Sequence, residues 1–515
     1  MLPFSKIMIE RYNAFLLYRR YRMLSFLNQY FFGPVLPVIL IICGGYFIIR
    51  LGFFPILHFR TVLAALFRKQ EDPNALPPWK SMLMALAGTL GVGNITGVAA
   101  AITAGGPGAV FWMWVSAVFA MFVKYAEILL AVKYQYKKDG AAYGGTPYYI
   151  RDGLKLPLLA AGFSFFLLAA NFSVGNTVQT FAAAEALDTI FHTPRWITGL
   201  VMSVGVLYVT LGGGKRIVRL TSVLVPLLSG GYFIVSVWII LSRCSSLPGV
   251  FSKIMADAFR PEAGIGGILG YLTMRGLRFG TARGILSNEA GCGTAPFAYA
   301  SAEAKSPVEQ GFFGIVEVFV DTIVLCTMTA VVILLEPDLI GQADGTALAL
   351  LAYEKGIGHG AGIFLSVSIV LFAFASVVAW AYYGTEALRF LNRQKPSARG
   401  VHIYLWLYGL SGFAGAVLAP QIIWDISDFS ISVMTIVNVI CILLMSNTVI
   451  AETRRYFMQA PGAKQVLRAF RLIRKQAPPV KQSQDTMHRV PTEAVRVDFR
   501  HEKQCQEYPK QPRLR

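Results

Sequence analysis

The sequence predicts an all-α polytopic membrane protein with about eleven transmembrane helices, and three observations carry that prediction. Of the 515 residues, 55% are hydrophobic and only 15% are charged, whereas soluble domains carry about 25% charged residues. Apolar segments of roughly 20 residues, the length that spans a bilayer as a helix, recur along the chain. Lys and Arg collect between alternate segments. These features exclude a disordered chain, a coiled coil and an ordinary soluble enzyme.

Hydropathy divides the chain into three regions. Residues 1–31 form a basic N-terminal segment, residues 32–450 a transmembrane domain, and residues 451–515 a basic, proline-containing tail that we expect to be largely disordered. Two of the predicted spans, 157–188 and 262–300, are longer than one crossing of the bilayer needs. The predicted spans are 32–49, 81–104, 108–132, 157–188, 197–212, 220–242, 262–300, 308–335, 361–388, 401–419 and 429–450.

The distribution of cations orients these spans. If the loop after the first span is cytoplasmic, the five cytoplasmic loops (50–80, 133–155, 213–219, 301–307 and 389–399) hold 18 Lys and Arg, against five in the outside loops. The tail carries 15 Lys and Arg against six Asp and Glu, and it falls on the inside. Because cytoplasmic loops of membrane proteins are enriched in Lys and Arg, we expect a multi-pass protein of the cell (inner or plasma) membrane with a cytoplasmic C-terminus.

The net charge of +19 therefore reports orientation, and nothing in it indicates nucleic acid. The basic N-terminus falls outside by this count, which either an interfacial amphipathic segment or an error in the number of spans would explain. Residues 452–476 either begin as a basic helix on anionic membrane lipid or form a solvated tail. No metal-ligand spacing or nucleophile–base pair is apparent, so we do not expect an enzyme.

The most informative feature is an interrupted second span. Residues 87–97 read AGTLGVGNITG, with four glycines in ten residues from Gly88 to Gly97. Such a run makes a poor continuous helix. A break at membrane depth exposes amide and carbonyl groups that suit a carboxylate and a bare cation respectively, as in transporters with discontinuous helices. The alternative is close helix packing through small residues. A nucleotide fingerprint fails, because the GxGxxG spacing is absent.

The seventh span is interrupted in the same manner. Residues 280–294 read GTARGILSNEAGCGT and combine glycine with polar and charged residues. With the first span set aside, spans 2–6 and 7–11 form two sets of five, and each set opens with its broken helix. Five is an odd number, so the second set runs in the opposite sense. The sequence thus predicts a five-plus-five inverted repeat with one extra N-terminal helix.

Several motifs in order resemble those of the alanine or glycine:cation symporters, also called sodium:alanine symporters. The resemblance runs from about residue 32 to 456 and is carried by GVGNITGVA, GGPGAVFWMWV and KYAEILLAVKY within 88–134, GGTPYYI at 144–150, GNTVQT at 175–180, RGILSNEAGCGTAP at 283–296, DTIVLCTMTA at 321–330 and FAFASVVAWAYYGTE at 372–386. The resemblance implies the LeuT-like fold, which agrees with the count above. It also implies symport of alanine, glycine or a similarly small amino acid with sodium.

The resemblance further implies a substrate site. It assigns the backbone of Val92 and Gly93 to the substrate carboxylate, Asn94 to the ligand or ion site and Gln179 to the substrate. Trp380 lies one helical turn from Ser376, and its indole would wall a small pocket. Three alternatives remain open: Asn94 as a helix cap, Gln179 as an interhelical hydrogen bond and Trp380 as a residue of the interfacial belt.

A sodium site is implied next to it. The carbonyls of Ala87 and Leu90 would face the ion, with Thr89 nearby. Ser376 offers a hydroxyl oxygen, the ligand type that hard cations prefer, or else an ordinary intrahelical hydroxyl. The buried charges Lys124, Glu127, Glu289, Glu317 and Asp321 are interpreted as gating or structural ion pairs rather than substrate contacts.

Three positions depart from the family pattern. Val92 stands where the family has a threonine. Ala375 and Ser376 stand where the family has a Ser-Thr pair. Thr146 and Pro147 stand where the family has Pro-Met. The first two departures remove hydroxyl oxygens beside the substrate and sodium sites. The leading hypothesis is a sodium-coupled symporter that works by alternating access. The alternatives are proton coupling with a degenerate sodium site, and a transporter-like amino-acid sensor.

Overall fold

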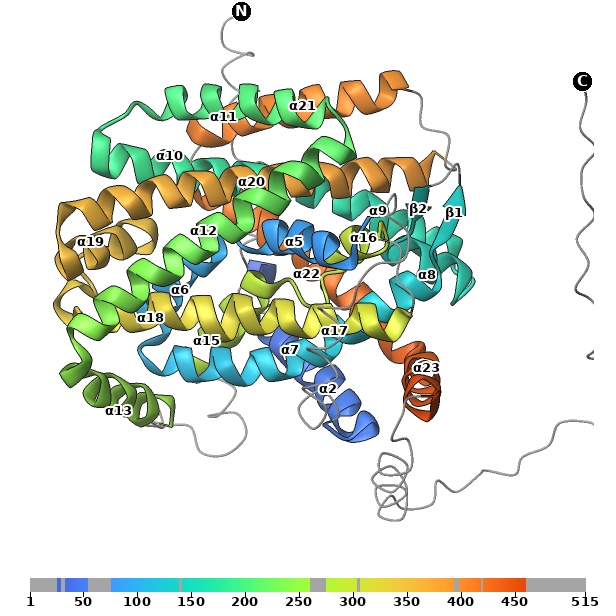
Figure 1. Cartoon of the computed structure of the whole chain (residues 1–515), viewed down its shortest axis with the longest axis horizontal. Coiled ribbons are helices and arrows are strands. Elements are labelled where there is room, and N and C mark those ends of the chain that lie inside the picture. Colours follow the sequence, from blue (N-terminus) through green and yellow to red (C-terminus); the bar gives the residue numbers. More distant parts are fainter. Residues whose placement is uncertain are drawn as a thin grey trace, which may run out of the picture. The chain divides into compact units, whose positions relative to one another are not determined.

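The computed structural model describes residues 26–28, 33–53, 76–138, 141–259, 275–302, 306–392, 398–417 and 420–459 (Figure 1). Nearly all of this part is helical, which confirms the all-α fold class. A short antiparallel hairpin, β1 (Tyr136–Lys138) with β2 (Ala141–Tyr143), is an addition that was not predicted. Most of the N-terminal segment 1–31 and residues 460–515 of the tail lie outside the described residues.

The helices coincide with the predicted spans. Seven segments of the described chain are long and apolar enough to cross a membrane: α7 (Gly108–Lys133), α9–η3–α10 (Pro157–Phe172, Ser173–Thr177, Val178–Phe191), α12 (Gly214–Ser242), α17–η5–α18 (Pro307–Val318, Phe319–Cys326, Thr327–Leu334), α20 (His359–Leu391), α21 (Ala398–Val417) and α22 (Pro420–Leu444). Two shorter apolar helices, α2 (Gly33–Leu51) and α11 (Arg195–Thr210), occupy the first and fifth predicted spans.

The two interrupted spans are broken helices, as predicted. The second span consists of α5 (Pro78–Thr89), a turn η2 (Val92–Asn94) and α6 (Thr96–Gly105), with a bend of 63° between its halves. In the seventh span, α15 (Arg275–Asn288) and α16 (Ala295–Tyr299) are separated by non-helical residues. Its beginning, 262–274, lies outside the described residues. The bend excludes simple small-residue packing of a continuous helix as the reason for the glycines at 88–97.

Helices of the first set of five pack against their counterparts in the second set. The helix α7 packs on α17, α10 on α20, and α11 on α21, which lie side by side in Figure 1. The first half of each broken helix meets the second half of the other, α5 with α16 and α6 with α15. This crossed pairing places the two broken helices in opposite directions, as an inverted repeat requires.

Burial separates the helices into an inner and an outer group. In the most apolar window of α7, 78% of residues are buried, whereas in α12 only 28% are. The outer helices expose large apolar side chains such as Tyr208, Val223 and Trp238, each about two-thirds exposed. Contiguous apolar surface of this extent is rare on soluble monomers and is the surface that contacts lipid in a membrane.

The loops gather on two faces as the alternation of spans predicts. Residues from all five loops on the basic side line one cavity of about 1100 Å³: Lys80, Lys137, Lys215, Ser301 and Arg389 are among them. On the opposite face, Glu336 forms ion pairs with Arg243 and Lys355 and so joins two of the loops there.

Six further helical elements complete the described chain. The loops also contain α8 (Thr146–Asp152), α13 (Leu247–Ala258) and α19 (Gly345–Ile357), and two short turns of 3-10 helix, η4 (Cys244–Ser246) and η6 (Pro337–Leu339). The helix α23 (Ser446–Gln459) extends beyond the last span into the region predicted as tail. Residues 452–459 are therefore helical, and the placement of this helix on anionic lipid stays a prediction.

Candidate ligand site at the two broken helices

The break in the first broken helix frees backbone groups in the interior of the protein. The helix α5 ends with the Leu90 N–H on the carbonyl of Leu86, and the Gly91 N–H then turns back to the carbonyl of Thr89. The Val92 N–H, next along the chain, donates to Oε1 of Gln179 at 3.1 Å. Main-chain groups of the break are thus bound by side chains rather than by their own helix, as buried backbone requires.

Gln179 lies where it was predicted, on α10 against the first break. Its amide nitrogen also donates to the carbonyl of Val174, 3.4 Å away. A Cβ atom added to Gly91 would lie 2.6 Å from Gln179 Oε1, so only glycine allows this approach. The side chain of Gln179 therefore makes an interhelical hydrogen bond and also lies beside the break.

Asn94 binds to the second set of helices and does not cap α6. Its Nδ2 donates to Oδ1 of Asp321 at 2.7 Å and to the carbonyl of Asp321 at 3.1 Å. The N-cap position of α6 is occupied by Ile95, with no side-chain cap. The cap alternative is therefore wrong. The Oδ1 atom of Asn94 is buried and accepts no hydrogen bond from the residues that the structure describes, so an acceptor oxygen is available inside the site.

Asp321 belongs to this site, although it was interpreted as a gating or structural charge. Besides Asn94, it accepts hydrogen bonds from Ser287 Oγ at 2.9 Å and from Thr322 Oγ1 at 2.8 Å. It lies in the π-helical turn η5, and turns of this type are frequent at functional sites. The signal in the sequence was a carboxylate inside an apolar span, which is a functional hypothesis by default.

Ser376 on α20 reaches across to α5. Its hydroxyl donates to the carbonyl of Gly88 at 2.9 Å, so it is not an ordinary intrahelical hydroxyl. Gly88 directly follows Ala87 in the chain, so this contact lies within the stretch of carbonyls predicted to face sodium. Thr89 makes different contacts: its hydroxyl donates to the carbonyls of Ala85 and Leu86 and lies 3.5 Å from Glu317. No hydrogen bond joins Thr89 to Ser376.

Trp380 is a buried residue with a polar partner. Its side chain is 1% exposed, which excludes the interfacial belt. The indole Nε1 donates to Oε1 of Glu289 at 3.2 Å, while Thr294 donates to the other carboxylate oxygen at 2.6 Å. The ring packs directly on Gly175, where an added Cβ would lie 2.7 Å from an indole carbon.

The second break turns through left-handed backbone. Glu289, Gly291 and Gly293 have φ values of +52°, +80° and +78°. Glycine adopts this region without steric cost, which accounts for the glycines of the motif, while Glu289 is one of few other residues to do so. The side chain of Asn288 stabilises the turn by accepting from the Ala290 N–H at 3.0 Å. These turns aim Glu289 toward Trp380.

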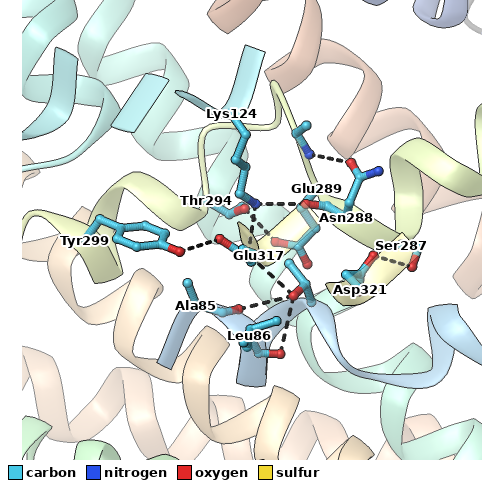
Figure 2. Close-up of polar contacts among 12 residues, drawn as sticks. Ala85, Leu86, Lys124, Ser287, Asn288, Glu289, Thr294, Tyr299, Glu317 and Asp321 are labelled. Atoms are coloured by element: carbon cyan, nitrogen blue, oxygen red, sulfur yellow. Dashed lines mark hydrogen bonds and ion pairs between the residues drawn. The ribbon is translucent and has the colours of Figure 1, made fainter. Parts of the chain in front are cut away.

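A buried ion pair connects the two breaks (Figure 2). Lys124 Nζ on α7 lies 3.1 Å from Oε1 of Glu317 and donates to the carbonyl of Asn288 at 2.8 Å. Tyr299 on α16 donates to Oε2 of Glu317 at 2.7 Å. The interpretation of Lys124 and Glu317 as ion-pair residues is confirmed, although their partners come from different spans. Glu289 does not pair with Arg283, which lies over the ring of Trp424.

A small pocket lies against the first break. It is lined by backbone and side chains of the break and by three residues that sequence reasoning missed; the lining is Leu90, Gly91, Asn94, Ile95, Tyr232, Leu325 and Phe372. Its volume of about 10 Å³ suits roughly one water molecule. The missed residues are aromatic or aliphatic and are indistinguishable in sequence from other core positions. Gln179 and Trp380 contact the two breaks but do not line this pocket.

The larger cavity lies on the basic side and shares none of its described lining residues with the small pocket. Beyond the cationic residues given above, its lining includes Pro77 and Trp79 at the start of α5 and Tyr382 on α20. Tyr382 follows Trp380 by two residues on α20. The cavity therefore reaches the first turn of α5 and the C-terminal part of α20, whereas the opposite face is joined by the ion pairs of Glu336.

Comparison with known proteins relates the chain to one family of transporters. The sequence profile described as "Sodium:alanine symporter family" matches residues 19–469. The chain is 37% identical over 445 residues to an uncharacterized transporter of Haemophilus influenzae, covering 85% of this chain and 96% of that protein. It is 35% identical over 442 residues to the sodium/alanine symporter AgcS of Methanococcus maripaludis, covering 83% and 95%. A solved manganese transporter of Eremococcus coleocola has the same fold, with a TM-score of 0.50 and 12% identity over 81% of this chain and 92% of that one.

Proposed function

The chain belongs to the sodium:alanine symporter family, and from that premise we propose that it is a symporter that imports a small amino acid, alanine or glycine, together with sodium. The protein is a multi-pass membrane protein with the LeuT-like helical fold, and its family transports amino acids by symport. The proposal adds the particular substrate, the ion and the residues that bind them. It also assigns the protein to the cell membrane, in contact with lipid and with the C-terminal tail in the cytoplasm.

One observation carries the proposal: the first break presents a backbone donor and a backbone acceptor whose partners are uncharged side chains. The Val92 N–H is bound by Gln179, and the Gly88 carbonyl by Ser376. A carboxylate oxygen can replace the glutamine oxygen at the N–H, and a sodium ion can replace the hydroxyl hydrogen at the carbonyl. The site can therefore exchange internal hydrogen bonds for a zwitterion and a cation.

The substrate is proposed to bind with its carboxylate at the backbone of Val92 and Gly93. The positive end of a helix N-terminus favours an anion at that point, and α6 begins directly after the break. Asn94 and Gln179 would hold the amino acid by hydrogen bonds, and the indole of Trp380 would limit the length of its side chain.

Sodium is proposed to bind between α5 and α20. The carbonyls of Ala87 and Leu90 and the hydroxyl of Ser376 would provide oxygen ligands, with Thr89 nearby. The contact between Ser376 and Gly88 supports this set, because it shows that α20 reaches the carbonyls of α5. Sodium would stabilise one state of the protein by joining these two helices.

Transport would follow by alternating access. The cavity of about 1100 Å³ lies on the basic face, at the start of α5 and beside Tyr382 of α20, while Glu336 pairs with cations of the opposite loops. We assign this asymmetry to an inward-facing state, in which substrate would leave through the cavity. Because each ligand must bind the two states differently to drive the cycle, opening of the other face would accompany closure of this one.

Proton coupling is the second candidate for the ion. Four carboxyl groups, Glu127, Glu289, Glu317 and Asp321, lie buried near the breaks, and Lys124 is the cation that the described residues place among them. Buried carboxylates without a paired cation are costly, so a proton is an alternative to sodium at one of them. A transporter-like sensor would bind the amino acid without net movement, with the basic tail contacting a partner.

Uptake into proteoliposomes tests the proposal. Purified protein is reconstituted, and labelled alanine and glycine are followed under an imposed sodium gradient or an imposed proton gradient. Accumulation driven by sodium alone supports the proposal, and accumulation driven by protons alone selects the alternative. Absence of accumulation with either gradient, together with retained alanine binding, would indicate a sensor. The variants Asn94→Ala and Gln179→Ala should both reduce binding; normal uptake by both would contradict the assigned site.

A further inference from the structure

Lys124 occupies an unusual position for a lysine at membrane depth. Its side chain is fully buried, and its ammonium group has two defined ligands, the carboxylate of Glu317 at 3.1 Å and the carbonyl of Asn288 at 2.8 Å (Figure 2). Asn288 is the last residue of α15, so its carbonyl has lost its helical partner through the break. One ligand is therefore part of the element that the break creates.

The two ligands together resemble the environment of a bound ion. The C-terminal end of a helix carries partial negative charge, which favours a cation within the last turn. Carbonyls at the C-terminal ends of half-helices coordinate the coupling ion in transporters of this general type. At the end of α15, the ammonium group of Lys124 satisfies this carbonyl and a carboxylate at the same time.

The ion pair also reaches the remaining halves of the broken helices. Glu317 accepts a hydrogen bond from Tyr299 on α16 and lies 3.5 Å from the hydroxyl of Thr89 at the end of α5. Glu127 and Glu289 lie close enough to Lys124 to interact with it electrostatically. A single positive charge is therefore held among groups from α5, α7, α16, α17 and both sides of the second break.

A second lysine on the same helix shows what an ordinary ion pair looks like. Lys133 pairs with Glu452 on α23, and the two side chains are 31% and 24% exposed. No main-chain carbonyl of a broken helix takes part. Such exposed pairs contribute little to stability. Lys133 is thus a matched control for the removal of a lysine charge from α7.

We propose that Lys124 is a tethered cation: its ammonium group fills a monovalent-cation position at the end of α15, in place of an ion from solution. This inference rests on the proposed function only for its consequence in transport, namely that the second break contributes no sodium to the coupling. Removal of the side chain by Lys124→Ala would leave the Asn288 carbonyl and the Glu317 carboxylate as a vacant ligand pair. A small cation such as ammonium or sodium would then bind there.

The primary test measures thermal stability of the full-length protein in detergent and needs no substrate. Lys124→Ala, Lys133→Ala and the unmodified protein are melted in increasing ammonium chloride at constant sodium, with choline chloride as the bulky control. A ligand that binds only the folded state raises the melting temperature with its concentration. We expect Lys124→Ala to be the variant whose melting temperature rises with ammonium and not with choline. Lys124→Met, which keeps most of the side-chain volume, should not respond.

Binding of labelled alanine gives a second readout. For Lys124→Ala, the Hill coefficient for sodium should exceed that of the unmodified protein by about one, because sodium then fills both positions. An unchanged coefficient with normal affinity would overturn the inference, as would an equal response of all variants to ammonium. Absence of sodium-dependent alanine binding in the unmodified protein would contradict the proposed function and leave the melting experiment valid.

If Lys124→Ala does not fold in any salt, a double variant takes its place in the test. Lys124→Met with Glu317→Gln removes the cation and its carboxylate together and so leaves no unpaired buried charge. If this double variant folds and binds alanine with the affinity of the unmodified protein, Lys124 is only the partner of Glu317 and the inference is wrong. If it folds and binds alanine more weakly while the dependence of binding on sodium is kept, the tethered charge at the break is supported.

Discussion

The indole Nε1 of Trp380 donates a hydrogen bond to Oε1 of Glu289 at a distance of 3.2 Å. The bond fixes the indole ring, which belongs to α20, to Glu289, a residue with left-handed backbone at the second break. The opposite edge of the same ring packs on Gly175 of η3. Trp380 thus relates the geometry of the second break to a helix of the first set, and its contacts can be removed one at a time.

Replacement of Trp380 by phenylalanine should weaken alanine binding. The variant keeps an aromatic ring but leaves Glu289 Oε1 without its buried donor, and a hydrogen bond to a charged group contributes about 1.5–3 kcal/mol. We expect the alanine affinity to fall by about ten-fold or more, measured by binding of labelled alanine. Trp238→Phe, at a surface position on α12, is the control and should bind normally. Equal affinity of Trp380→Phe and the unmodified protein would show that the bond does not support the site.

Gly175→Ala tests the other edge of the indole. The added methyl group would lie 2.7 Å from a ring carbon of Trp380, so the ring must shift. Overpacking of this kind costs about 1–3 kcal/mol. Transport of alanine should decrease, and the melting temperature should fall. Gly162→Ala, on α9 in the same span, meets no atom within 4 Å and serves as the matched control. A similar loss in both variants would indicate a general effect of alanine in this span.

Ser376→Ala should reduce the affinity for sodium. The variant loses the hydroxyl that reaches the Gly88 carbonyl, and with it one proposed ligand oxygen. A net loss of about 1 kcal/mol raises the half-saturating sodium concentration for alanine uptake by roughly five-fold. Ser368→Ala removes a hydroxyl from the same helix that bonds only to the carbonyl of Phe364, and it should leave that concentration unchanged. The sodium site is wrongly assigned if the two variants behave alike.

Glu336→Gln should loosen the closed face of the protein. Glu336 is almost buried and pairs with Arg243 and Lys355, whose side chains are partly exposed. Loss of both pairs is expected to cost on the order of 1 kcal/mol after allowance for solvent screening. Amide hydrogen exchange in α19 should therefore become several-fold faster. Asp338→Asn, at a position 79% exposed and 3.6 Å from Lys355, should exchange like the unmodified protein. Unaltered exchange in Glu336→Gln would exclude this pair of contacts as an outer closure.

The architecture was largely predictable because the bilayer restricts the possible structures. Apolar length locates helices, and the glycines at 88–97 and 280–294 indicate breaks that lipid would not tolerate in a regular helix. The departures concern features that this argument does not address. The hairpin β1–β2 and the helices α13 and α19 lie in polar loops, where no hydrophobic period of membrane length is required.

The site was predicted in part, and the physical reason is the range of the interactions. Gln179 and Ser376 were suggested by the resemblance to the family, whereas their backbone partners, Val92 and Gly88, lie 87 and 288 residues away and could not be read from local sequence. Asp321 and Glu289 were visible as buried charges, but their partners Asn94 and Trp380 lie more than 90 residues away. Pairing at that separation is decided by the packing of helices, which a single sequence does not encode in a readable pattern.

The basic residues that line the large cavity affect the rate at which ligands can enter it again. Of the described residues, Lys80, Lys137, Lys215, Arg219 and Arg389 line it against one carboxylate, Glu386, so its potential is positive. For the proposed substrate and ion, an amino acid zwitterion has no net charge and would cross this field freely, whereas a sodium ion would be repelled on its way back. The positive potential would slow the entry of sodium through the cavity and so slow the backward transport cycle, without altering the equilibrium gradient. This effect would weaken as salt screens the field.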